Sequence, residues 1–316
     1  MISVLMSVYC KEAPAWFARA LRSITLEQTR PPEELVLVAD GPLTEELEEE
    51  IRKLREILRK QEGSPAEQRT QGIHFRVIRL PENRQLGRAL QTGLKYCRGE
   101  LIARMDTDDI ARPERLEHQE KFMNTHPEVA ACGGEIAEFE TEGEILRVKH
   151  MPETPEALYQ YGKYRNPLNH MTVMFRKAAV EQVGGYRHFP LLEDYHLWSR
   201  MLAAGMKFSN LSEVLVEARI GSGFAKKRGG REYFRRYKKL RSLQLKWGYL
   251  TPPEYATSLT VTYAMTMQPG WVRGKAYQVL RKDLSKWKSP GASCILKNGL
   301  FHNRTEKRKR VENGTV

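Results

Sequence analysis

The order of strand-like and helix-like segments constrains the fold of this chain more than any other feature. Segments rich in β-branched and large apolar residues predict strands at 2–9, 35–39, 73–80 and 101–105, and helix-compatible segments lie between them, at 15–26, 44–60 and 87–97. Strands that alternate with helices predict a parallel sheet with helices on both faces. We therefore expect an α/β fold.

The second half of the chain has shorter strand-like segments. A turn at Thr141-Glu142-Gly143 joins two of its short strands, so some pairing should be antiparallel and the sheet mixed, mainly parallel. The chain should end in helices. The expected segments are strands at 129–132, 135–139, 145–149 and 170–175, helices at 154–161 and from about Asp194, and basic helices at 231–247 and after Pro252-Pro253.

The positive charge of the chain is concentrated at its C-terminal end. The 316 residues carry 52 Lys and Arg against 39 Asp and Glu, a formal net charge of +13. Counted along the sequence, residues 1–220 have a net charge of −4 and residues 221–316 a net charge of +17. This split favours one anionic partner or surface that meets the C-terminal part. No nucleic acid is expected as a partner; salt-sensitive DNA or RNA binding is the rival hypothesis.

The N-terminus and the cysteines indicate the compartment. The four cysteines have no paired short spacing of the kind that zinc sites or redox motifs use. The first residues lack the basic region and cleavage site of a secretory signal. No stretch reaches the roughly 18 to 20 apolar residues of a spanning helix, and residues 255–272 read as a packed or interfacial helix. A cytoplasmic location is therefore expected.

A cluster of carboxylates follows the strand predicted at 101–105. Asp106, Asp108 and Asp109 lie within four residues, and clustered carboxylates repel one another unless a cation compensates them. Mg²⁺ or Mn²⁺ typically takes one or two such groups and completes its shell with substrate phosphate and water. Asp40 follows the strand at 35–39, at the same sheet edge, where open α/β sheets bind ligands. The alternatives are an acidic turn at 106–109 and an ordinary turn at Asp40.

Several short motifs follow one another in order over residues 1–225. They are Val4-Leu5-Met6-Ser7-Val8-Tyr9, Val36-Leu37-Val38-Ala39-Asp40-Gly41, residues 83–93, Arg98-Gly99-Glu100, Asp106-Thr107-Asp108-Asp109, Arg112-Pro113-Glu114-Arg115-Leu116, Val183-Gly184-Gly185-Tyr186 and Glu193-Asp194-Tyr195-His196-Leu197-Trp198. In this order and spacing the chain resembles glycosyltransferase family 2, with the nucleotide-diphospho-sugar transferase (GT-A) fold. The resemblance implies a catalytic domain at 1–225, with a donor half at about 1–110 and an acceptor half at about 111–225.

The resemblance also implies roles for the residues of the donor half. Ser7, Tyr9 and Asp40 would hold the nucleotide, most often uridine, and Asp106 would face the ribose or the sugar. Asp108 would be the direct ligand of Mn²⁺ or Mg²⁺. A metal ion there would bridge the two phosphates and neutralise the leaving nucleoside diphosphate as a Lewis acid.

In the acceptor half, Asp194 matches the catalytic base of the family. It would take the proton of an acceptor hydroxyl that attacks C1 from the face opposite the diphosphate. Such a displacement inverts the configuration, so an α-linked UDP-sugar would give a β-glycoside. Glu193 and His170 match positions near the acceptor. Without the resemblance, Glu193-Asp194 would read as an N-cap and His170 as a hydrogen-bonded core residue.

The chain departs from the family pattern in two places. The family often has Gly where Gln85 stands and Asn where Gln91 stands, which predicts a donor-side loop of different shape. The Gln-x-x-Arg-Trp signature of processive synthases is absent, which favours the addition of a single sugar.

Residues 226–303 are expected to form a basic amphipathic helical region, and 304–316 a disordered tail. Lys227 and Arg228 lie beside glycines, which fits a loop that closes over the donor diphosphate, or a solvated linker. Aromatic and basic residues recur near helical spacing in 231–247 and 271–288, as in interfacial anchors. The alternative is a helical subdomain packed on the catalytic domain.

The resemblance and the basic end together predict a bacterial enzyme of O-antigen, capsule or exopolysaccharide synthesis. It would be peripheral at the inner face of the cytoplasmic membrane, with a UDP-sugar as donor and a lipid-diphosphate-linked glycan as acceptor. A catalytically inactive member that serves as a binding subunit is the remaining alternative.

Overall fold

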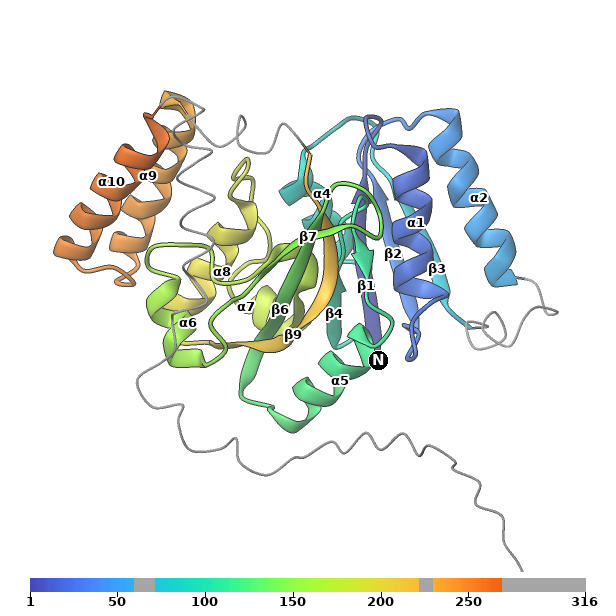
Figure 1. The fold of residues 1–316 in the computed structure, drawn as a ribbon, viewed down its shortest axis with the longest axis horizontal. Coiled ribbons are helices and arrows are strands. Elements are labelled where there is room, and N and C mark those ends of the chain that lie inside the picture. Colours follow the sequence, from blue (N-terminus) through green and yellow to red (C-terminus); the bar gives the residue numbers. More distant parts are fainter. Residues whose placement is uncertain (60–71, 222–229, 269–316) are drawn as a thin grey trace, which may run out of the picture.

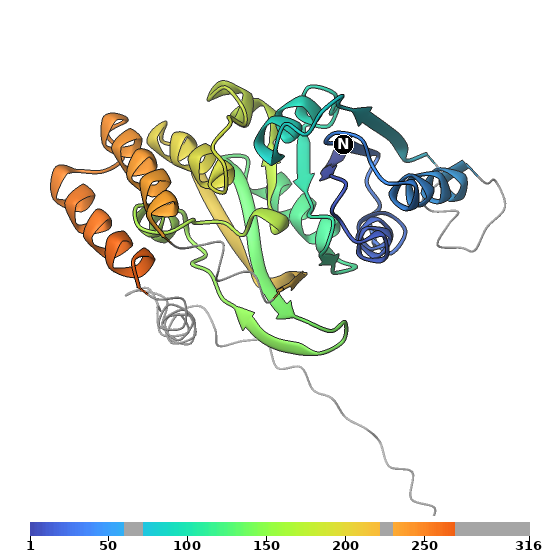
Figure 2. The same ribbon diagram turned by 90° about the horizontal axis from the view of Figure 1, so that it is seen from above.

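A computed structural model describes residues 1–59, 72–221 and 230–268 of the chain. Within these residues the strands form one nine-stranded sheet with helices on both faces (Figures 1 and 2). The strands are β1 (Ile2–Val8), β2 (Glu34–Ala39), β3 (His74–Arg79), β4 (Leu101–Arg104), β5 (Ile110–Ala111), β6 (Val129–Phe139), β7 (Ile145–Lys149), β8 (Met174–Arg176) and β9 (Lys207–Arg219). The helices are α1 (Pro14–Thr25), α2 (Glu45–Arg59), α4 (Leu86–Leu94), α5 (Arg115–Thr125), α6 (Pro155–Tyr161), the 3₁₀ turn η1 (His170–Thr172), α7 (Lys177–Gln182), α8 (Glu193–Ala203), α9 (Arg231–Lys246) and α10 (Pro252–Thr266).

The strand order brings several strand ends to one edge of the sheet. The order is β3-β2-β1-β4-β8-β6-β9-β5, with β7 paired to β6. The first four strands are parallel, and β8 lies antiparallel between β4 and β6. Because β6 also pairs in parallel with β9, the carboxyl ends of β1, β2, β4, β6 and β9 share one edge. The predicted mixed, mainly parallel α/β sheet is confirmed.

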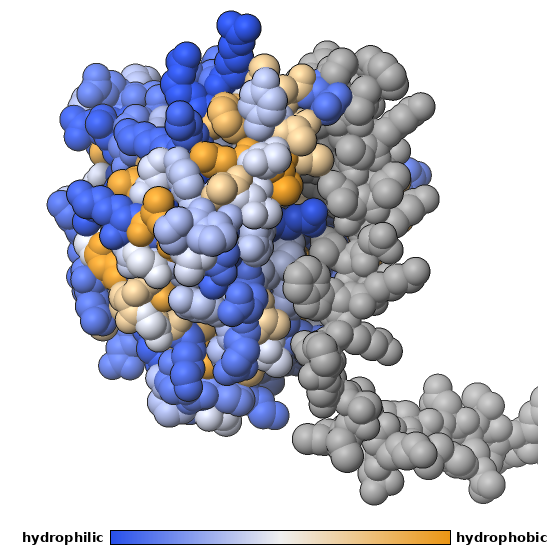
Figure 3. Space-filling model, turned by 90° about the vertical axis from the view of Figure 1, so that its left-hand side faces the viewer, coloured by the Kyte–Doolittle hydropathy of each residue, from blue (hydrophilic) through white to orange (hydrophobic). Residues whose placement is uncertain are grey.

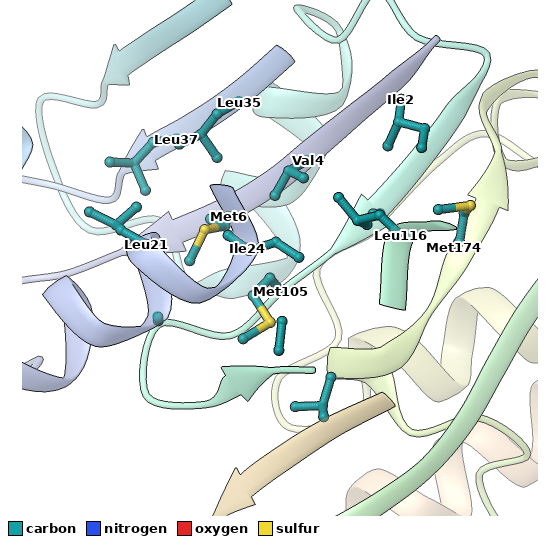
Figure 4. Packing of buried hydrophobic residues seen from close by; sticks show 14 of the residues in the cluster. Ile2, Val4, Met6, Leu21, Ile24, Leu35, Leu37, Met105, Leu116 and Met174 are labelled. Carbon is teal, nitrogen blue, oxygen red and sulfur yellow. The ribbon is translucent and has the colours of Figure 1, made fainter. Parts of the chain in front are cut away.

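Alternating residues of the strands build a core on each face of the sheet. Ile2, Val4 and Met6 of β1 pack on the face covered by α1, α2 and α5 (Figure 4), whereas Leu5 belongs to the cluster formed with α4, α7 and α8. This period of two, with both faces buried, explains why β1 reads as a continuous apolar run.

Three predicted segments are wrong. The strands expected at 129–132 and 135–139 are one strand, β6, because β9 pairs with it along its whole length. The strand expected at 170–175 is the 3₁₀ turn η1 followed by the short strand β8. The 13-residue strand β9 had no counterpart in the sequence analysis. Its apolar residues are interrupted by polar ones, and its partner lies far away in the sequence.

Helix α9 packs on the rest of the α/β structure. Tyr233 and Leu240 are buried, and the fully buried Arg241 donates to Lys163 O at 2.5 Å and to the Tyr195 hydroxyl at 2.8 Å. The aromatic and apolar side chains of the anchor-like pattern in α9 are buried or half-buried, whereas most of its basic side chains are exposed. For this helix the packing favours the interpretation as a helical subdomain.

Helix α10 lies against α9 and has an uncharged surface beyond its first turn. It begins with a capping box in which Thr251 and Glu254 satisfy each other's backbone amides. Val261, Tyr263 and Met267 are exposed, and hydrophobic patches stand among mostly hydrophilic side chains on this side of the molecule (Figure 3). Among the described helices, none is long and apolar enough to cross a membrane. The segments at 271–288 and 304–316 lie outside the described residues.

Candidate active site

The predicted donor residues gather at the shared sheet edge. β1 and β2 end side by side, with Val8 paired to Ala39, and Asp40 donates its backbone N–H to Val8 O at 2.8 Å. β4 ends next to them at Arg104, so the loop that carries Asp106 and Asp108 starts at the same place. The structure thus brings Ser7, Tyr9, Asp40, Asp106 and Asp108 to one edge, as the sequence predicts.

Asp40 fixes the loop in front of α4. Its Oδ1 accepts the backbone N–H of Arg84 at 2.6 Å, and its carbonyl accepts Asn83 Nδ2 at 3.3 Å. Burial raises the pKa of Asp40, although the hydrogen bonds from the 84–85 backbone oppose the rise. Gln85 has a φ of 67°, in the left-handed region. This conformation explains why glycine is favoured at this position in the family.

The acidic loop after β4 holds three carboxylates in different environments. Asp106 forms an ion pair with the buried Arg104. Burial, and next the charge of Asp106, raises the pKa of Asp108 to about 6. Asp109 is buried and its pKa is raised well above its usual value by burial and by its two acidic neighbours. Its Oδ1 accepts the backbone N–H of Arg219 at 2.8 Å, whereas its Oδ2 has no hydrogen-bond partner among the described residues.

This donor set fits a divalent cation. Carboxylate oxygens are the ligands that Mg²⁺ and Mn²⁺ prefer, and a cation would relieve the repulsion that raises the pKa of Asp108. No group of three or more His, Cys, Asp or Glu side chains in the described part of the chain is arranged to hold a metal ion. A cation here would therefore depend on Asp108 together with substrate phosphate and water.

Arg219, at the end of β9, is a site residue that the sequence analysis missed. Its Nε donates to Asp108 O at 3.2 Å, while its backbone N–H holds Asp109. The guanidinium carbon lies 4.5 Å from the ring centroids of both Trp16 and Phe139. Stacking on aromatic faces suits the planar guanidinium. Arg219 therefore fastens the acidic loop to the opposite half of the sheet.

The predicted base lies at the first turn of α8. Asp194 Oδ2 accepts Asn166 Nδ2 at 2.5 Å, and its Oδ1 accepts the backbone N–H of Tyr195 at 2.7 Å. Burial, and next the charge of Asp194, raises the pKa of Glu193 to about 7. A Cβ on Gly87 would lie 3.0 Å from Glu193 Cβ. The absence of a side chain at Gly87 thus lets α4 approach the start of α8.

Arg104 lies between the donor carboxylates and the start of α8. It forms an ion pair with Asp106, and its charge favours the ionised forms of Asp108 and Glu193. The charge of Asp106 in turn raises the pKa of Glu193. Residues that are almost ninety positions apart therefore interact around one buried guanidinium. This convergence could not be obtained from the motifs alone, because none of them shows that Arg104 lies near the start of α8.

His170 is a core residue. It is 9% exposed, lies in η1 instead of at the start of a strand, and its Nε2 is hydrogen-bonded to the Tyr186 hydroxyl at 3.0 Å. Burial, and next the charge of Arg104, lowers the pKa of His170 well below its usual value, so the ring is neutral. These observations favour the core interpretation. Lys227 and Arg228 lie outside the described residues.

Comparisons with known proteins agree with this arrangement. The sequence model described as Glycosyl transferase family 2 matches residues 3–183. The amylovoran biosynthesis glycosyltransferase AmsE of Erwinia amylovora is 36% identical over 281 residues, which cover 89% of this chain and 92% of the relative. The UDP-Gal:alpha-D-GlcNAc-diphosphoundecaprenol beta-1,3-galactosyltransferase of Escherichia coli is 32% identical over 284 residues, with coverages of 89% and 97%.

A solved structure supports the fold. The structure of S. aureus TarS 1-349 in complex with UDP-GlcNAc superposes with a TM-score of 0.62 at 17% identity, over 90% of this chain and 78% of that chain. The chain therefore belongs to glycosyl transferase family 2 and is a glycosyltransferase with the GT-A fold. Its relatives include glycosyltransferases of amylovoran and O-antigen biosynthesis.

Proposed function

We propose that the chain transfers one sugar from a UDP-sugar to a lipid-diphosphate-linked glycan, with inversion and with the help of Mn²⁺ or Mg²⁺. The observation that carries the proposal is the convergence of Asp108 and the Glu193-Asp194 pair around Arg104. Two similar proteins support the proposed donor and acceptor. The structure of S. aureus TarS 1-349 contains UDP-GlcNAc, and the name of the E. coli galactosyltransferase gives a diphosphoundecaprenol-linked sugar as its acceptor. We place the enzyme at the cytoplasmic face of the membrane, where such an acceptor is accessible.

In this mechanism the side chains of the chain act on both ends of the reacting bond. Asp40, Ser7 and Tyr9 hold the nucleotide. Asp108 would hold a divalent cation, which would supply Lewis-acid stabilisation of the leaving UDP. Asp194 accepts the proton of the acceptor hydroxyl as its oxygen forms a bond to C1 of the sugar. The bond from C1 to the diphosphate breaks and its electrons leave with UDP, so the product is a β-glycoside.

The neighbouring carboxyl group limits the charge at the base. Because the pKa of Glu193 is about 7, Glu193 is partly protonated at neutral pH, which reduces its repulsion of Asp194. Asp194, held by Asn166 and the backbone N–H of Tyr195, is the carboxylate that we assign as the base. It still accepts a proton from a hydroxyl that becomes acidic as it attacks.

A donor screen tests the proposal. The full chain is incubated with UDP-, GDP- and TDP-sugars, and release of the free nucleoside diphosphate is measured with Mn²⁺, with Mg²⁺ and with EDTA. We expect Mn²⁺- or Mg²⁺-dependent turnover with a UDP-sugar and its loss in EDTA. Equal release from all three nucleotides, or release that EDTA leaves unchanged, would contradict the proposed donor and the metal dependence.

Arg219 gives a second prediction. Arg219→Lys retains a charge but loses the planar contacts with Trp16 and Phe139 and the geometry at the Asp108 carbonyl. We expect Mn²⁺-dependent affinity for UDP to fall by about tenfold, the effect of one lost charge-assisted hydrogen bond and its cation–π support. Isothermal titration calorimetry measures this change.

The matched control for this prediction is Arg112→Lys. Arg112 forms an ion pair at 3.1 Å with Glu217, which lies in β9 as Arg219 does. Replacing Arg112 by Lys therefore also weakens a contact between an arginine and β9. It does not touch the side chains of the acidic loop, and its affinity for Mn²⁺ and UDP should equal that of the wild type. Equal affinities of Arg219→Lys and wild type would show that Arg219 does not position the loop.

A further inference from the structure

Basic side chains meet at the glycine turn that precedes α8. Arg200 of α8 is 7% exposed, its Nη2 donates to Gly185 O at 2.5 Å, and its Nη1 donates to Val183 O. The Nη2 atom of Arg187 lies 3.0 Å from the position that a Cβ on Gly184 would take. Two guanidinium groups therefore flank one turn.

His196 and Lys239 extend this basic cluster toward α9. The ring of His196 stacks on Phe189 with 4.7 Å between the centroids, and Lys239 Nζ lies 5.7 Å from the centroid of the same phenyl ring. Burial, and next the charges of Arg200, Arg187 and Lys239, lower the pKa of His196 to about 3. The imidazole is therefore neutral, and three cations are near enough to act on it.

The cluster lacks a compensating negative charge within the described residues. The charged groups that act on His196 and Arg200 are all cations. Arg200 Nε and His196 Nδ1 are both buried and have no hydrogen-bond partner there. Burial of an unpaired cation is costly, because its hydration is lost and no anion replaces it. A bound anion would supply the missing negative charge.

The cluster borders the candidate base. A Cβ on Gly87 would lie 2.9 Å from Arg187 O and 3.0 Å from Glu193 Cβ. The backbone of Arg187 and the first residue of α8 therefore both contact α4 at Gly87. Arg187 and Lys239 are exposed. An anion held by them would be accessible from solvent and would lie on the acceptor side of the proposed reaction.

The loop between Arg187 and the start of α8 is held in a strained shape. Leu191 has a φ of 69°, in the left-handed region that bulky residues rarely occupy, and it is 53% exposed. Arg236 of α9 donates from Nη1 to Pro190 O at 3.2 Å. Such strain persists only where surrounding contacts impose it. Helix α9 thus contributes Lys239 to the cluster and, through Arg236, a hydrogen bond that holds this loop. The loop exposes the apolar side chain of Leu191 close to the cluster.

We propose that Arg187, Lys239, Arg200 and His196 form the binding site for the diphosphate of the lipid-linked acceptor. Guanidinium and ammonium groups bind phosphate oxygens through charge-assisted hydrogen bonds, and the exposed Leu191 offers a contact for the first part of the lipid. The inference rests on the proposed function, because it assigns the acceptor's anionic group to one site. It also gives part of the basic C-terminal region a role in substrate binding.

The test titrates the full chain with farnesyl diphosphate by calorimetry, in EDTA so that no divalent cation links the diphosphate to Asp108. The variants are Arg187→Ala, Lys239→Ala and the double variant, in which both altered side chains are exposed in the wild type. The control is Lys246→Ala, an exposed lysine on the same face of α9, about 10 Å further along the helix. Farnesol and phosphatidylglycerol vesicles are the comparison ligands, and Mn²⁺-dependent UDP binding is measured on each preparation.

We expect each single variant to weaken farnesyl diphosphate binding by about tenfold, and the double variant by more, since each loses a charge-assisted contact. Lys246→Ala should bind as the wild type does, and farnesol should not bind. Unchanged affinity in the double variant would overturn the site, as would binding to vesicles but not to farnesyl diphosphate. If UDP binds but farnesyl diphosphate does not, the inference alone fails; if UDP does not bind, the proposed function fails as well.

Discussion

Asp194→Asn is expected to lower kcat for sugar transfer by about 10²- to 10⁴-fold, the contribution of a general base. The amide retains an oxygen that accepts the backbone N–H of Tyr195, and Asn166 can reorient to pair with it, so the fold should persist. The affinity for UDP with Mn²⁺ should stay close to that of the wild type, because Asp194 acts on the acceptor. Steady-state kinetics and calorimetry on the same preparation measure both quantities.

Glu181→Gln is the control for this substitution. Glu181 is an exposed carboxylate of α7, and its nearest cation, Lys177, is 3.6 Å away. This neutralisation changes the net charge in the same way, and its kcat should not differ from that of the wild type. If Asp194→Asn turned over at the wild-type rate, the proton of the acceptor would have to go elsewhere, and the assignment of the base would be wrong.

The second large effect is expected from Asp108→Asn. Loss of the carboxylate removes the ligand that holds the cation, and metal stabilisation of a leaving diphosphate is worth several kcal/mol. We expect turnover to fall by about 10²- to 10⁴-fold and the Mn²⁺-dependent part of UDP binding to disappear. Dependence of turnover on Mn²⁺ concentration and calorimetric titration of UDP with and without Mn²⁺ provide the measurements.

The stability of the same variant separates loss of a ligand from loss of structure. Burial and Asp106 raise the pKa of Asp108 to about 6 in the folded chain. Ionisation of Asp108 therefore opposes folding, and stability is lost as the pH rises from the ordinary value near 4 through 6. Asn does not ionise, so without metal the variant should melt at the wild-type temperature or above it at pH 7.5. A lower melting temperature would mean that lost activity reflects a damaged fold.

The local part of the fold and of the site could be predicted from the sequence. The strands β1, β2 and β4 are apolar runs whose side chains alternate between two covered faces, so their identity depends on nearby residues. Asp40 directly follows β2, and Asp106 comes two residues after the end of β4. Because parallel strands end at one edge, their meeting there required only the correct strand order.

Contacts between distant segments could not be predicted in this way. Strand β9 is stabilised by β6, about eighty residues earlier, and its own pattern of apolar residues is irregular. Arg219 acquires its role because β9 ends beside the acidic loop. The basic helix α9 has a pattern that suits either a membrane or a protein surface, and only the structure shows that Arg241 is buried against Lys163 and Tyr195.

The sequence by itself determined the α/β class, the family and the carboxylates at the strand ends, since these features depend on short-range pattern and spacing. Only the tertiary structure decided which charges act together. It places Arg104 between Asp106 and Glu193 and gathers cations from α8, α9 and the preceding loop around His196. The physical reason is that electrostatic coupling depends on distance in space and on burial, and sequence separation specifies neither.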